Sequence, residues 1–342
     1  MRKESFTFSQ KTVDSYFDFS FAGMGTICNT NNVIIITDEN VFFHHREAFS
    51  NYRVITIKAG EQNKNQQAID GIIDQLLQLE ADKNTFIIGV GGGVVTDMAG
   101  YAASIYKRGV LLGLVPTSIL GMVDAAIGGK NGVDVGMYKN MVGTIYQPEF
   151  IIYDYAFLQT LPVKEWINGF AEIIKHACIK DATMFTMLQR YTLHDFQTDL
   201  TLVADLIEKN AGLKFNIVTQ DEFERGDRKL LNFGHTIGHA IENLHSLSHG
   251  HAISIGMVAA CNLSEKINGF HFDDARKVVS LLAAYHLPVD IVTDYERVFD
   301  VLKLDKKRNG ASIDFILLNR IGDAAVKPIE LNMLHENFKS IL

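Results

Sequence analysis

Hydrophobic residues in the first half of the chain follow two alternating spacings. Short runs rich in β-branched and aliphatic residues predict strands at residues 33–37, 54–57, 86–89, 110–115 and 150–153. Between them, residues 66–79 and 94–105 carry apolar side chains three and four positions apart, which is the spacing of an amphipathic helix. The alternation of strands and helices predicts a parallel α/β layer.

The spacing changes after Leu161-Pro162, where helical periodicity takes over and strand signals nearly vanish. Helices are predicted at residues 166–180, 200–214, 234–244, 251–266 and 274–285. We therefore expect an α/β domain over residues 1–162, followed by a mostly α-helical domain over residues 163–342. Because no low-complexity linker separates the two domains, the boundary is expected to be a packed hinge.

The composition is that of an ordinary globular protein, because 47% of the 342 residues are hydrophobic and 21% are charged. The N-terminus lacks the apolar core of a signal peptide, and no apolar run is long enough to span a bilayer. A cytoplasmic protein without a membrane partner is therefore expected. The three cysteines are too few and too far apart for a disulfide framework or a cysteine metal site: Cys28, Cys178 and Cys261.

The net charge of -8 argues against nucleic acid as a partner. Basic residues nevertheless recur within the motifs described below, and such local clusters inside an acidic protein indicate a small anionic ligand. These basic residues are Lys130, Lys139, Lys214, Arg228, Lys306 and Lys307.

Two histidines four residues apart, His235 and His239, lie in an apolar segment that is compatible with a helix. On a helix they share one face, and imidazole is the commonest metal ligand in proteins. The segment is not a His-Glu-x-x-His motif, because Thr236 follows the first histidine, so at least one further ligand must come from elsewhere. The candidates are Glu172, His249 and His251. One glutamate and two histidines would leave a coordination position open, as in catalytic zinc sites.

A glycine-rich segment, Gly91-Gly92-Gly93-Val94, follows a predicted strand and opens a predicted helix. Glycines there let backbone N–H groups approach a diphosphate, and the helix N-terminus favours its negative charge. The acidic residue that usually binds the ribose about twenty positions later is absent, and either Asp38 or Glu61 could replace it. A second polar cluster runs from Thr117 to Lys130 and suits phosphate and sugar oxygens.

Taken in order, the motifs resemble the 3-dehydroquinate synthase family over about residues 33–323. The shared elements are Gly60-Glu61-x-x-Lys64, Gly91-Gly92-Gly93-Val94-x-x-Asp97, Pro116-Thr117-Ser118, Val123-Asp124, Gly128-Gly129-Lys130, Lys139-Asn140, Gln147-Pro148, Glu172-x-x-Lys175, Asp221-Glu222-x-Glu224-x-Gly226-x-Arg228, Leu231-Asn232-x-Gly234-His235-x-x-Gly238-His239-Ala240, His249-Gly250 and Asp305-Lys306-Lys307. Two positions depart from the family pattern: Ser118 replaces a threonine, and His251 stands where a glutamate is usual.

The resemblance implies a Rossmann-like NAD-binding domain, then a helical domain with Zn2+ or Co2+ bound by Glu172, His235 and His249. It implies NAD contacts at Asp38, Asn40, Glu61, Lys64, Gly91, Gly92, Gly93, Val94, Asp97, Thr117, Ser118, Lys130, Lys139, Phe157 and Thr160. It implies catalytic or substrate contacts at Asp124, Lys130, Asn140, Lys175, Lys214, Arg228, Asn232, His239 and Lys306, with Arg108 reaching across a homodimer. His239 then moves from the metal to the substrate.

The implied activity is a phosphate-eliminating cyclisation in the shikimate pathway of aromatic amino acid biosynthesis. It converts 3-deoxy-D-arabino-heptulosonate 7-phosphate to 3-dehydroquinate and phosphate, with NAD used catalytically. Lys130, Asn140 and Lys306 would bind the phosphate, and Lys214 and Arg228 the carboxylate.

Three other functions are considered. A cyclase acting on sedoheptulose 7-phosphate or glucose 6-phosphate has a substrate without a carboxylate, which would leave Lys214 and Arg228 unpaired. A metal-dependent polyol dehydrogenase would release NADH and would need no phosphate cluster. A catalytically silent sensor of nucleotide and metal would not need the complete set of lysines and metal ligands.

Overall fold

The computed structural model describes residues 1–136, 138–303, 308–309 and 311–342. It divides into two compact units. The first unit comprises Met1–Glu165 and Ala204–Glu222, and the second comprises Trp166–Val203 and Phe223–Leu342. The chain therefore passes between the units at residues 165–166, 203–204 and 222–223. The sequence predicted a single boundary, after residue 162.

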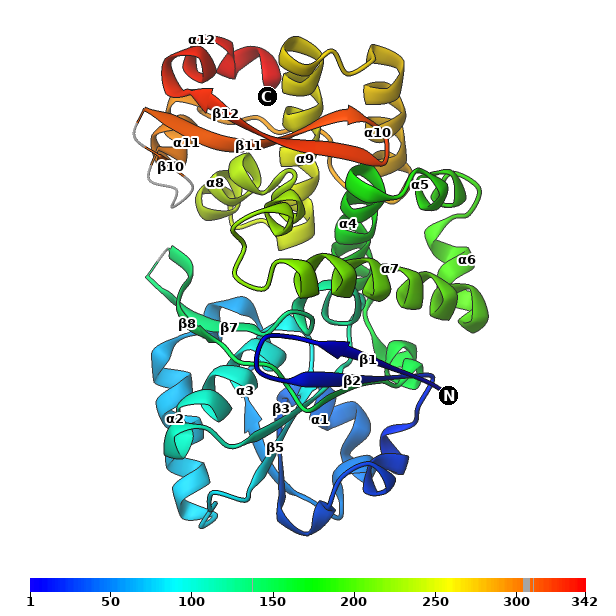
Figure 1. The fold of residues 1–342 in the computed structure, drawn as a ribbon, viewed down its shortest axis with the longest axis vertical. Helices are drawn as coiled ribbons and strands as arrows, with labels where there is room; N and C mark the ends of the chain where they lie inside the picture. Colours follow the sequence, from blue (N-terminus) through cyan, green and yellow to red (C-terminus); the bar gives the residue numbers. More distant parts are fainter. Residues whose placement is uncertain (137, 304–307, 310) are drawn as a thin grey trace. The chain divides into compact units, whose positions relative to one another are not determined.

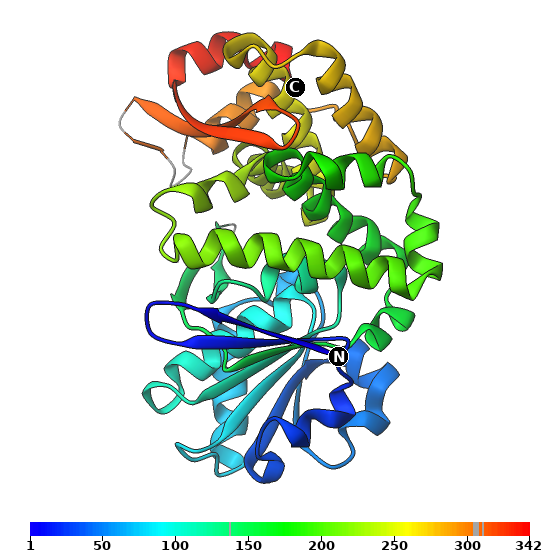
Figure 2. The same cartoon turned by 45° about the vertical axis from the view of Figure 1, so that its right-hand side comes forward.

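The first unit is built on a seven-stranded sheet with the strand order β1-β2-β9-β6-β5-β3-β4 (Figures 1 and 2). The strands are β1 (Arg2–Thr7), β2 (Thr12–Phe17), β3 (Val33–Asp38), β4 (Arg53–Ile57), β5 (Phe86–Gly91), β6 (Leu111–Pro116) and β9 (Phe150–Tyr153). β1 pairs antiparallel with β2, and every other pairing is parallel. The predicted parallel α/β layer is thus confirmed, with all five predicted strands in it.

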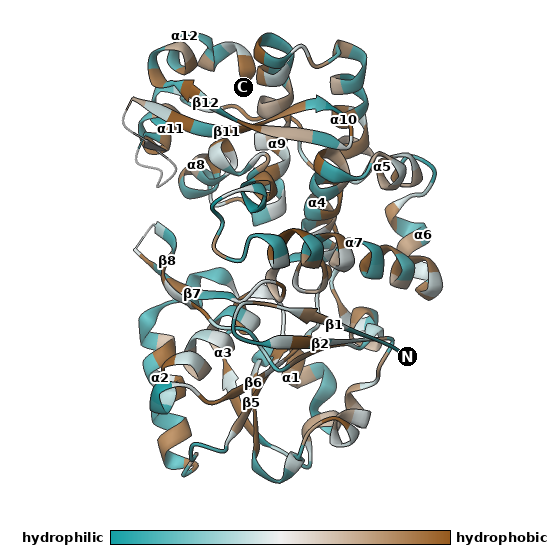
Figure 3. Ribbon diagram, in the orientation of Figure 1, coloured by the Kyte–Doolittle hydropathy of each residue, from teal (hydrophilic) through white to brown (hydrophobic). Residues whose placement is uncertain are grey.

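Helices cover both faces of this sheet. They are α1 (Glu39–His45), α2 (Gln66–Gln78) and α3 (Gly93–Ile105). α3 packs so closely on β5 that a Cβ on Gly89 would lie 2.8 Å from Cβ of Ala99. Alternate residues of β3 and β5, such as Ile35 and Ile88, belong to a core cluster on the other face, against which Phe42 of α1 packs. Burial on two faces explains why these strands are apolar at nearly every position (Figure 3).

Two hairpins of the first unit were not predicted from the sequence. The first is β1–β2, and the second pairs β7 (Lys130–Val135) with β8 (Tyr138–Ile145). The β1–β2 hairpin packs against α7 (Leu200–Gln220), where the rings of Phe6 and Phe215 stack with centroids 3.8 Å apart. This packing explains why residues 204–222, including Lys214, belong to the first unit.

The second unit is mostly helical, as predicted. Its helices are α4 (Val163–Lys180, which begins in the first unit), α5 (Ala182–Leu188), α6 (Leu193–Thr198), α8 (His235–His245), α9 (His249–Asn268), α10 (Phe272–Ala284), α11 (Tyr295–Leu302) and α12 (Leu331–Ile341). Shorter helical turns complete the two units at Phe21–Thr26, Thr30–Asn32, Arg46–Phe49, Glu61–Asn63, Tyr106–Arg108, Gly121–Ala125, Tyr155–Thr160 and Asp227–Asn232. None of the helices in the described part of the chain combines the length and hydropathy that a bilayer span requires.

No particular strand was predicted in the second unit, which nevertheless contains a small sheet. β10 (Arg308–Asn309), β11 (Ser312–Arg320) and β12 (Asp323–Glu330) form a three-stranded antiparallel sheet. β11 contributes Ile313, Phe315 and Leu317 to a core cluster shared with α8, α9, α11 and α12. Alternate residues of β11 enter this core, so the core residues of this strand recur at every second position. The surrounding region of the sequence is dominated by helices.

Candidate functional site

One carboxylate and two imidazoles converge inside the second unit. Glu172 is completely buried in the middle of α4, while His235 and His249 are the first residues of α8 and α9. Oε1 of Glu172 lies 3.6 Å from Nε2 of His235 and 3.2 Å from Nε2 of His249. Candidate ligand atoms of the three residues all lie within 4.8 Å of one another. This donor set suits a divalent metal with a position left open.

Neighbouring groups orient these three side chains. Nδ1 of His235 lies 3.1 Å from the carbonyl oxygen of Phe233, so an N–H there would leave Nε2 facing Glu172. Lys175, which is 1% exposed, forms an ion pair with Glu172. Burial lowers the pKa of His249, but the carboxylates of Glu172 and Glu242 outweigh it and raise that pKa to about 10. The carboxylates of Glu172 and Glu242 therefore favour a positive charge at the His249 ring.

Glycines at three positions allow α8 and α9 to begin where they do. Gly234 precedes α8 with a φ of 78°, a left-handed conformation that glycine adopts without steric cost. A Cβ on Gly256 would lie 2.0 Å from the carbonyl oxygen of Gly234, and one on Gly250 would lie 2.3 Å from the carbonyl oxygen of Asn168. The close approach of α9 to α8 and α4 thus brings His249 to Glu172.

We expect Gly256→Ala to destabilise the fold and weaken the metal centre together, because the added methyl group meets backbone rather than a movable side chain. Overpacking of this kind costs about 1–3 kcal/mol in the free energy of unfolding, measured by chemical denaturation. The matched control is Gly71→Ala on α2, where a Cβ would meet no atom of the described residues within 4 Å apart from the backbone of its own helix. That variant should be as stable as the parent, or more stable by up to about 1 kcal/mol. Equal stability of the two variants would contradict this packing argument.

The other two histidines of the sequence analysis occupy different environments. The His239 ring lies 5.1 Å from that of His235 and 6.2 Å from that of His249. Among the described residues, no donor set contains both His235 and His239, whereas His239 joins Glu242 and His249 in a second set. The initial hypothesis that the helical pair chelates one metal together is therefore not supported. His251 is partly buried and lies in none of the sets found in the described part of the chain.

The glycine-rich segment of the first unit has the predicted strand-to-helix geometry. β5 ends at Gly91, Gly92 precedes the helix, and Gly93 begins α3. A Cβ on Gly92 would lie 3.3 Å from Oγ of Ser118, and the Thr117 N–H donates to the Gly91 carbonyl oxygen at 3.0 Å. The structure therefore brings the two predicted loops together beside the exposed N–H groups of a helix start, which favours an anion there.

The two carboxylates proposed for the ribose have different roles in the structure. Oδ1 of Asp38 accepts hydrogen bonds from the N–H groups of Asn40 and Val41, so Asp38 caps α1. Glu61 is more exposed, and its Oε1 lies 3.9 Å from Nζ of Lys64 and 3.7 Å from Nζ of Lys139. A capping carboxylate retains lone pairs for a further hydroxyl, so both residues remain candidates.

Lys64 is the centre of a buried polar network in the first unit. Its Nζ donates to Oδ2 of Asp97 at 2.6 Å and to Oδ1 of Asn140 at 2.7 Å. Burial raises the pKa of Asp97 to about 6, although the Lys64 ammonium lowers it. The predicted cofactor residues Lys64 and Asp97 and the predicted substrate residue Asn140 thus share one hydrogen-bonded cluster.

Lys214 has a carboxylate partner within the protein. Its Nζ lies 2.7 Å from Oδ1 of Asp124 and 2.6 Å from the Asp124 carbonyl oxygen, and both residues belong to the first unit. The argument that a substrate without a carboxylate would leave Lys214 unpaired was therefore wrong. Arg228, the other cation predicted to bind the carboxylate, is 2% exposed in the second unit.

The remaining predicted residues fall in several places. Arg108 and Lys130 are exposed in the first unit, with Arg108 at a φ of 66°. Phe157 packs against the ring of His45 at 4.6 Å, and Oγ1 of Thr160 lies 2.7 Å from Nε2 of His45. Lys306 lies outside the described residues.

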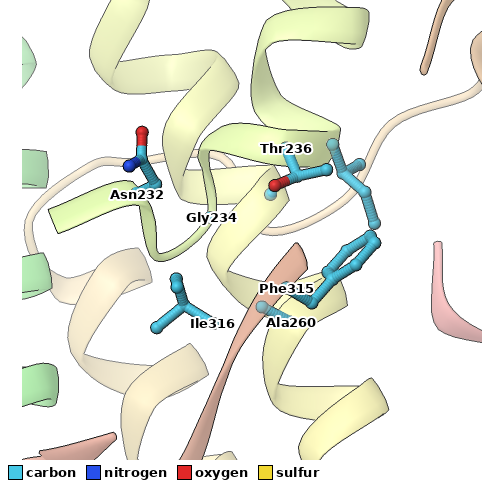
Figure 4. Close-up of a pocket in the computed structure, with 8 residues that line it drawn as sticks. Asn232, Gly234, Thr236, Ala260, Phe315 and Ile316 are labelled. Carbon is cyan, nitrogen blue, oxygen red and sulfur yellow. The ribbon is translucent and has the colours of Figure 1, made fainter. Parts of the chain in front are cut away.

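Asn232 lies at one end of a small pocket in the second unit. Figure 4 shows this pocket between the start of α8, α9 and β11, with Phe315, Ile316 and Ala260 forming its apolar side. The Asn232 side-chain N–H donates to Glu224 at 2.5 Å. The mostly apolar lining, together with its place beside the core cluster, makes this pocket a packing feature rather than a substrate site.

Three side chains that contact predicted site residues were not themselves predicted to belong to the site: Glu224, Glu242 and His45. Glu242 had a usable signal, because it lies one turn after His239 and two turns after His235 on the same helix face. His45 and Glu224 contact their partners across 115 and 8 residues of chain, and no local periodicity indicates these contacts.

Family models and curated relatives match most of the chain. The family model described as 3-dehydroquinate synthase N-terminal matches residues 54–168, and the C-terminal model matches residues 169–308. The 3-dehydroquinate synthase of Sulfurimonas denitrificans is 37% identical over 327 residues, which cover 93% of each chain. That of Pyrococcus abyssi is 39% identical over 282 residues, which cover 82% of each chain.

Two solved structures share the fold. One is 2-deoxy-scyllo-inosose synthase complexed with carbaglucose-6-phosphate, NAD+ and Co2+, with a TM-score of 0.87, 23% identity and complete coverage (100%) of both chains. The other is 2-epi-5-epi-valiolone synthase from Streptomyces hygroscopicus with NAD+ and Zn2+ bound, with a TM-score of 0.88, 23% identity and 98% coverage of both chains. On the evidence of the two family models and the relatives at 37–39% identity, the chain belongs to the 3-dehydroquinate synthase family.

Proposed function

We propose that the protein converts 3-deoxy-D-arabino-heptulosonate 7-phosphate to 3-dehydroquinate and phosphate, using NAD catalytically and a divalent metal, Zn2+ or Co2+. The observation that carries this proposal is the donor set of Glu172, His235 and His249 in a chain of this family. The related structures solved with NAD+ and with Co2+ or Zn2+ support the same two cofactors.

The residues present fit both cofactors. The three metal donors converge from α4, α8 and α9, and the Gly91–Gly93 segment offers a helix start for a diphosphate. When bound, the metal supplies Lewis acidity at the hydroxyl to be oxidised, and NAD accepts a hydride and returns it. Within the first unit, Lys64 would hold Asp97 and Asn140 in place, since it donates to both at hydrogen-bond distance.

The substrate groups require cations and proton acceptors. Arg228 suits the carboxylate because a guanidinium binds a carboxylate with two parallel hydrogen bonds. Lys130 and Asn140 suit the phosphate, while Lys214 would act through Asp124, whose carboxylate it holds at 2.7 Å. The sequence relationship further suggests a homodimer in which Arg108 acts in the partner's site, and Lys306 remains a predicted phosphate ligand.

The test is phosphate release from the heptulosonate phosphate with NAD+ present at a small fraction of the substrate concentration. We expect many turnovers for each NAD+, no net accumulation of NADH, and loss of activity after metal chelation with recovery on adding Zn2+ or Co2+. Both phosphate and NADH should be measured in the same reaction, since the hydride is returned within each turnover.

Stoichiometric NADH release without phosphate would instead identify a polyol dehydrogenase. Binding of NAD+ and metal without any turnover of the heptulosonate phosphate would support the silent sensor. Either result would overturn the proposal, because both cofactors would be present while the elimination and ring closure would not occur.

A further inference from the structure

Glu242 is a carboxylate buried beside the metal donors. It lies on α8, two helical turns after His235, and its side chain is 2% exposed. Taking a carboxylate out of water is costly unless nearby groups stabilise its charge. Oε2 of Glu242 lies 3.7 Å from Nδ1 of His249, an ion-pair distance. The buried carboxylate of Glu242 therefore places a negative charge next to Nδ1 of His249.

The His249 ring lies between two carboxylates. Its Nε2 is 3.2 Å from Oε1 of Glu172, while its Nδ1 faces Glu242. An imidazole that binds a metal through one nitrogen carries a proton on the other, and a carboxylate beside that N–H fixes the ring orientation and makes the ligand more basic. The positions of Glu172 and Glu242 match these two requirements.

We propose that Glu242 is a positioning residue for His249: its carboxylate holds the Nδ1 side of the imidazole, so that Nε2 is presented to a metal shared with Glu172 and His235. This inference rests on the proposed function, because it takes those three residues as the metal ligands. Glu242 also belongs to a second donor set with His239 and His249. If the metal binds Nε2 of His249, then Nδ1 of the same ring faces Glu242. Glu242 would then contact a metal ligand without binding the metal itself.

The experiment measures Co2+ binding to metal-free protein by optical titration, for the parent chain and for Glu242→Gln. Glutamine keeps the size of the side chain and removes its charge. We expect a roughly 10- to 100-fold weaker affinity with an unchanged absorption spectrum of bound Co2+, since the three ligands are retained. Glu242→Asp, which keeps the charge but withdraws it from Nδ1, should give an intermediate loss. Circular dichroism and thermal melting establish that each variant is folded.

The matched control is Glu265→Gln on α9, the same helix as His249 but outside the donor sets. Its Co2+ affinity should equal that of the parent. An equal loss of Co2+ affinity in Glu265→Gln and in Glu242→Gln would indicate a general effect of removing a negative charge and overturn the proposal.

Two other outcomes would also overturn it. Unchanged Co2+ affinity in folded Glu242→Gln and Glu242→Asp would remove the positioning role, and an altered Co2+ spectrum would identify Glu242 as a direct ligand. If the parent chain itself bound no Co2+, or bound it equally well without His235, the proposed metal ligands would be wrong, which is a failure of the proposed function.

Discussion

Replacing His235 with alanine is expected to abolish turnover while the protein remains folded. His235 is one of two imidazoles in the donor set, and without it Glu172 and His249 supply only two ligands. Lewis-acid assistance contributes several kcal/mol to such reactions, and a loss of about 4 kcal/mol corresponds to roughly 10³-fold in rate. Phosphate release gives the rate, elemental analysis gives the metal content, and circular dichroism gives the fold.

The choice between His249 and His251 can be tested in the same way. His249→Ala should lose the metal, since its Nε2 lies 3.2 Å from Glu172. His251→Ala is the matched control, because His251 lies two residues further along α9 and belongs to none of the donor sets in the described residues. It should retain metal and most activity. The reverse pattern would show that the ligand is misassigned, and full activity of a metal-free preparation would exclude a metal-dependent reaction.

Arg228→Ala should cripple the reaction of the heptulosonate phosphate. The side chain is 2% exposed, and loss of a charge-assisted hydrogen bond to a desolvated carboxylate costs about 2–4 kcal/mol. This predicts a drop of roughly 30- to 1000-fold in kcat/KM. NAD+ affinity should stay nearly unchanged, because Arg228 lies in the second unit and the predicted cofactor residues lie in the first. Steady-state kinetics and a separate NAD+ binding titration measure the two effects.

Two variants separate substrate binding from simple loss of a buried cation. Arg228→Lys keeps the charge but not the two-pronged geometry, so its activity should fall between those of the parent and Arg228→Ala. Lys229→Ala is the neighbouring control, because Lys229 pairs with Asp314 in a partly exposed ion pair at 2.9 Å. It should change kcat/KM by less than about threefold, since such pairs contribute little.

Sedoheptulose 7-phosphate, which lacks the carboxylate, should be a very poor substrate of the parent chain. We expect this discrimination because Arg228 is the guanidinium predicted to bind the carboxylate. If the parent chain cyclised both substrates equally well, or if Arg228→Ala left the heptulosonate reaction untouched, the proposed substrate would be wrong.

The sequence by itself determined most of the first sheet and most helices of the second unit. Strands β3, β5 and β6 are buried on both faces, so their residues are apolar at nearly every position and the pattern is clear. The glycine-rich turn before α3 was equally readable, because few residues other than glycine fit so close to a neighbouring loop. The motifs also selected Glu172, His235 and His249 through their resemblance to the family.

Local patterns were insufficient where an element depends on distant residues. In the β1–β2 hairpin, strand β1 is largely exposed. The hairpin packs on α7 through the rings of Phe6 and Phe215, which are more than two hundred positions apart in the sequence. The sequence of β11 alternates buried and less buried positions as a strand does, but the region around it in the chain is dominated by helices, and no strand was predicted there. In both cases the stabilising contacts come from elements far along the sequence, which a window of neighbouring residues does not contain.

Only the tertiary structure decided how the site residues are paired. Glu172 and His249 are 77 residues apart, and Lys214 and Asp124 are 90 residues apart, yet both pairs lie within 3.2 Å. Sequence spacing predicts which side chains share one helix face, and it therefore suggested that His235 and His239 act together. Which of them meets Glu172 depends on the approach of α8, α9 and α4, and that approach is fixed by packing around Gly250 and Gly256 because backbone atoms there leave no space for a side chain.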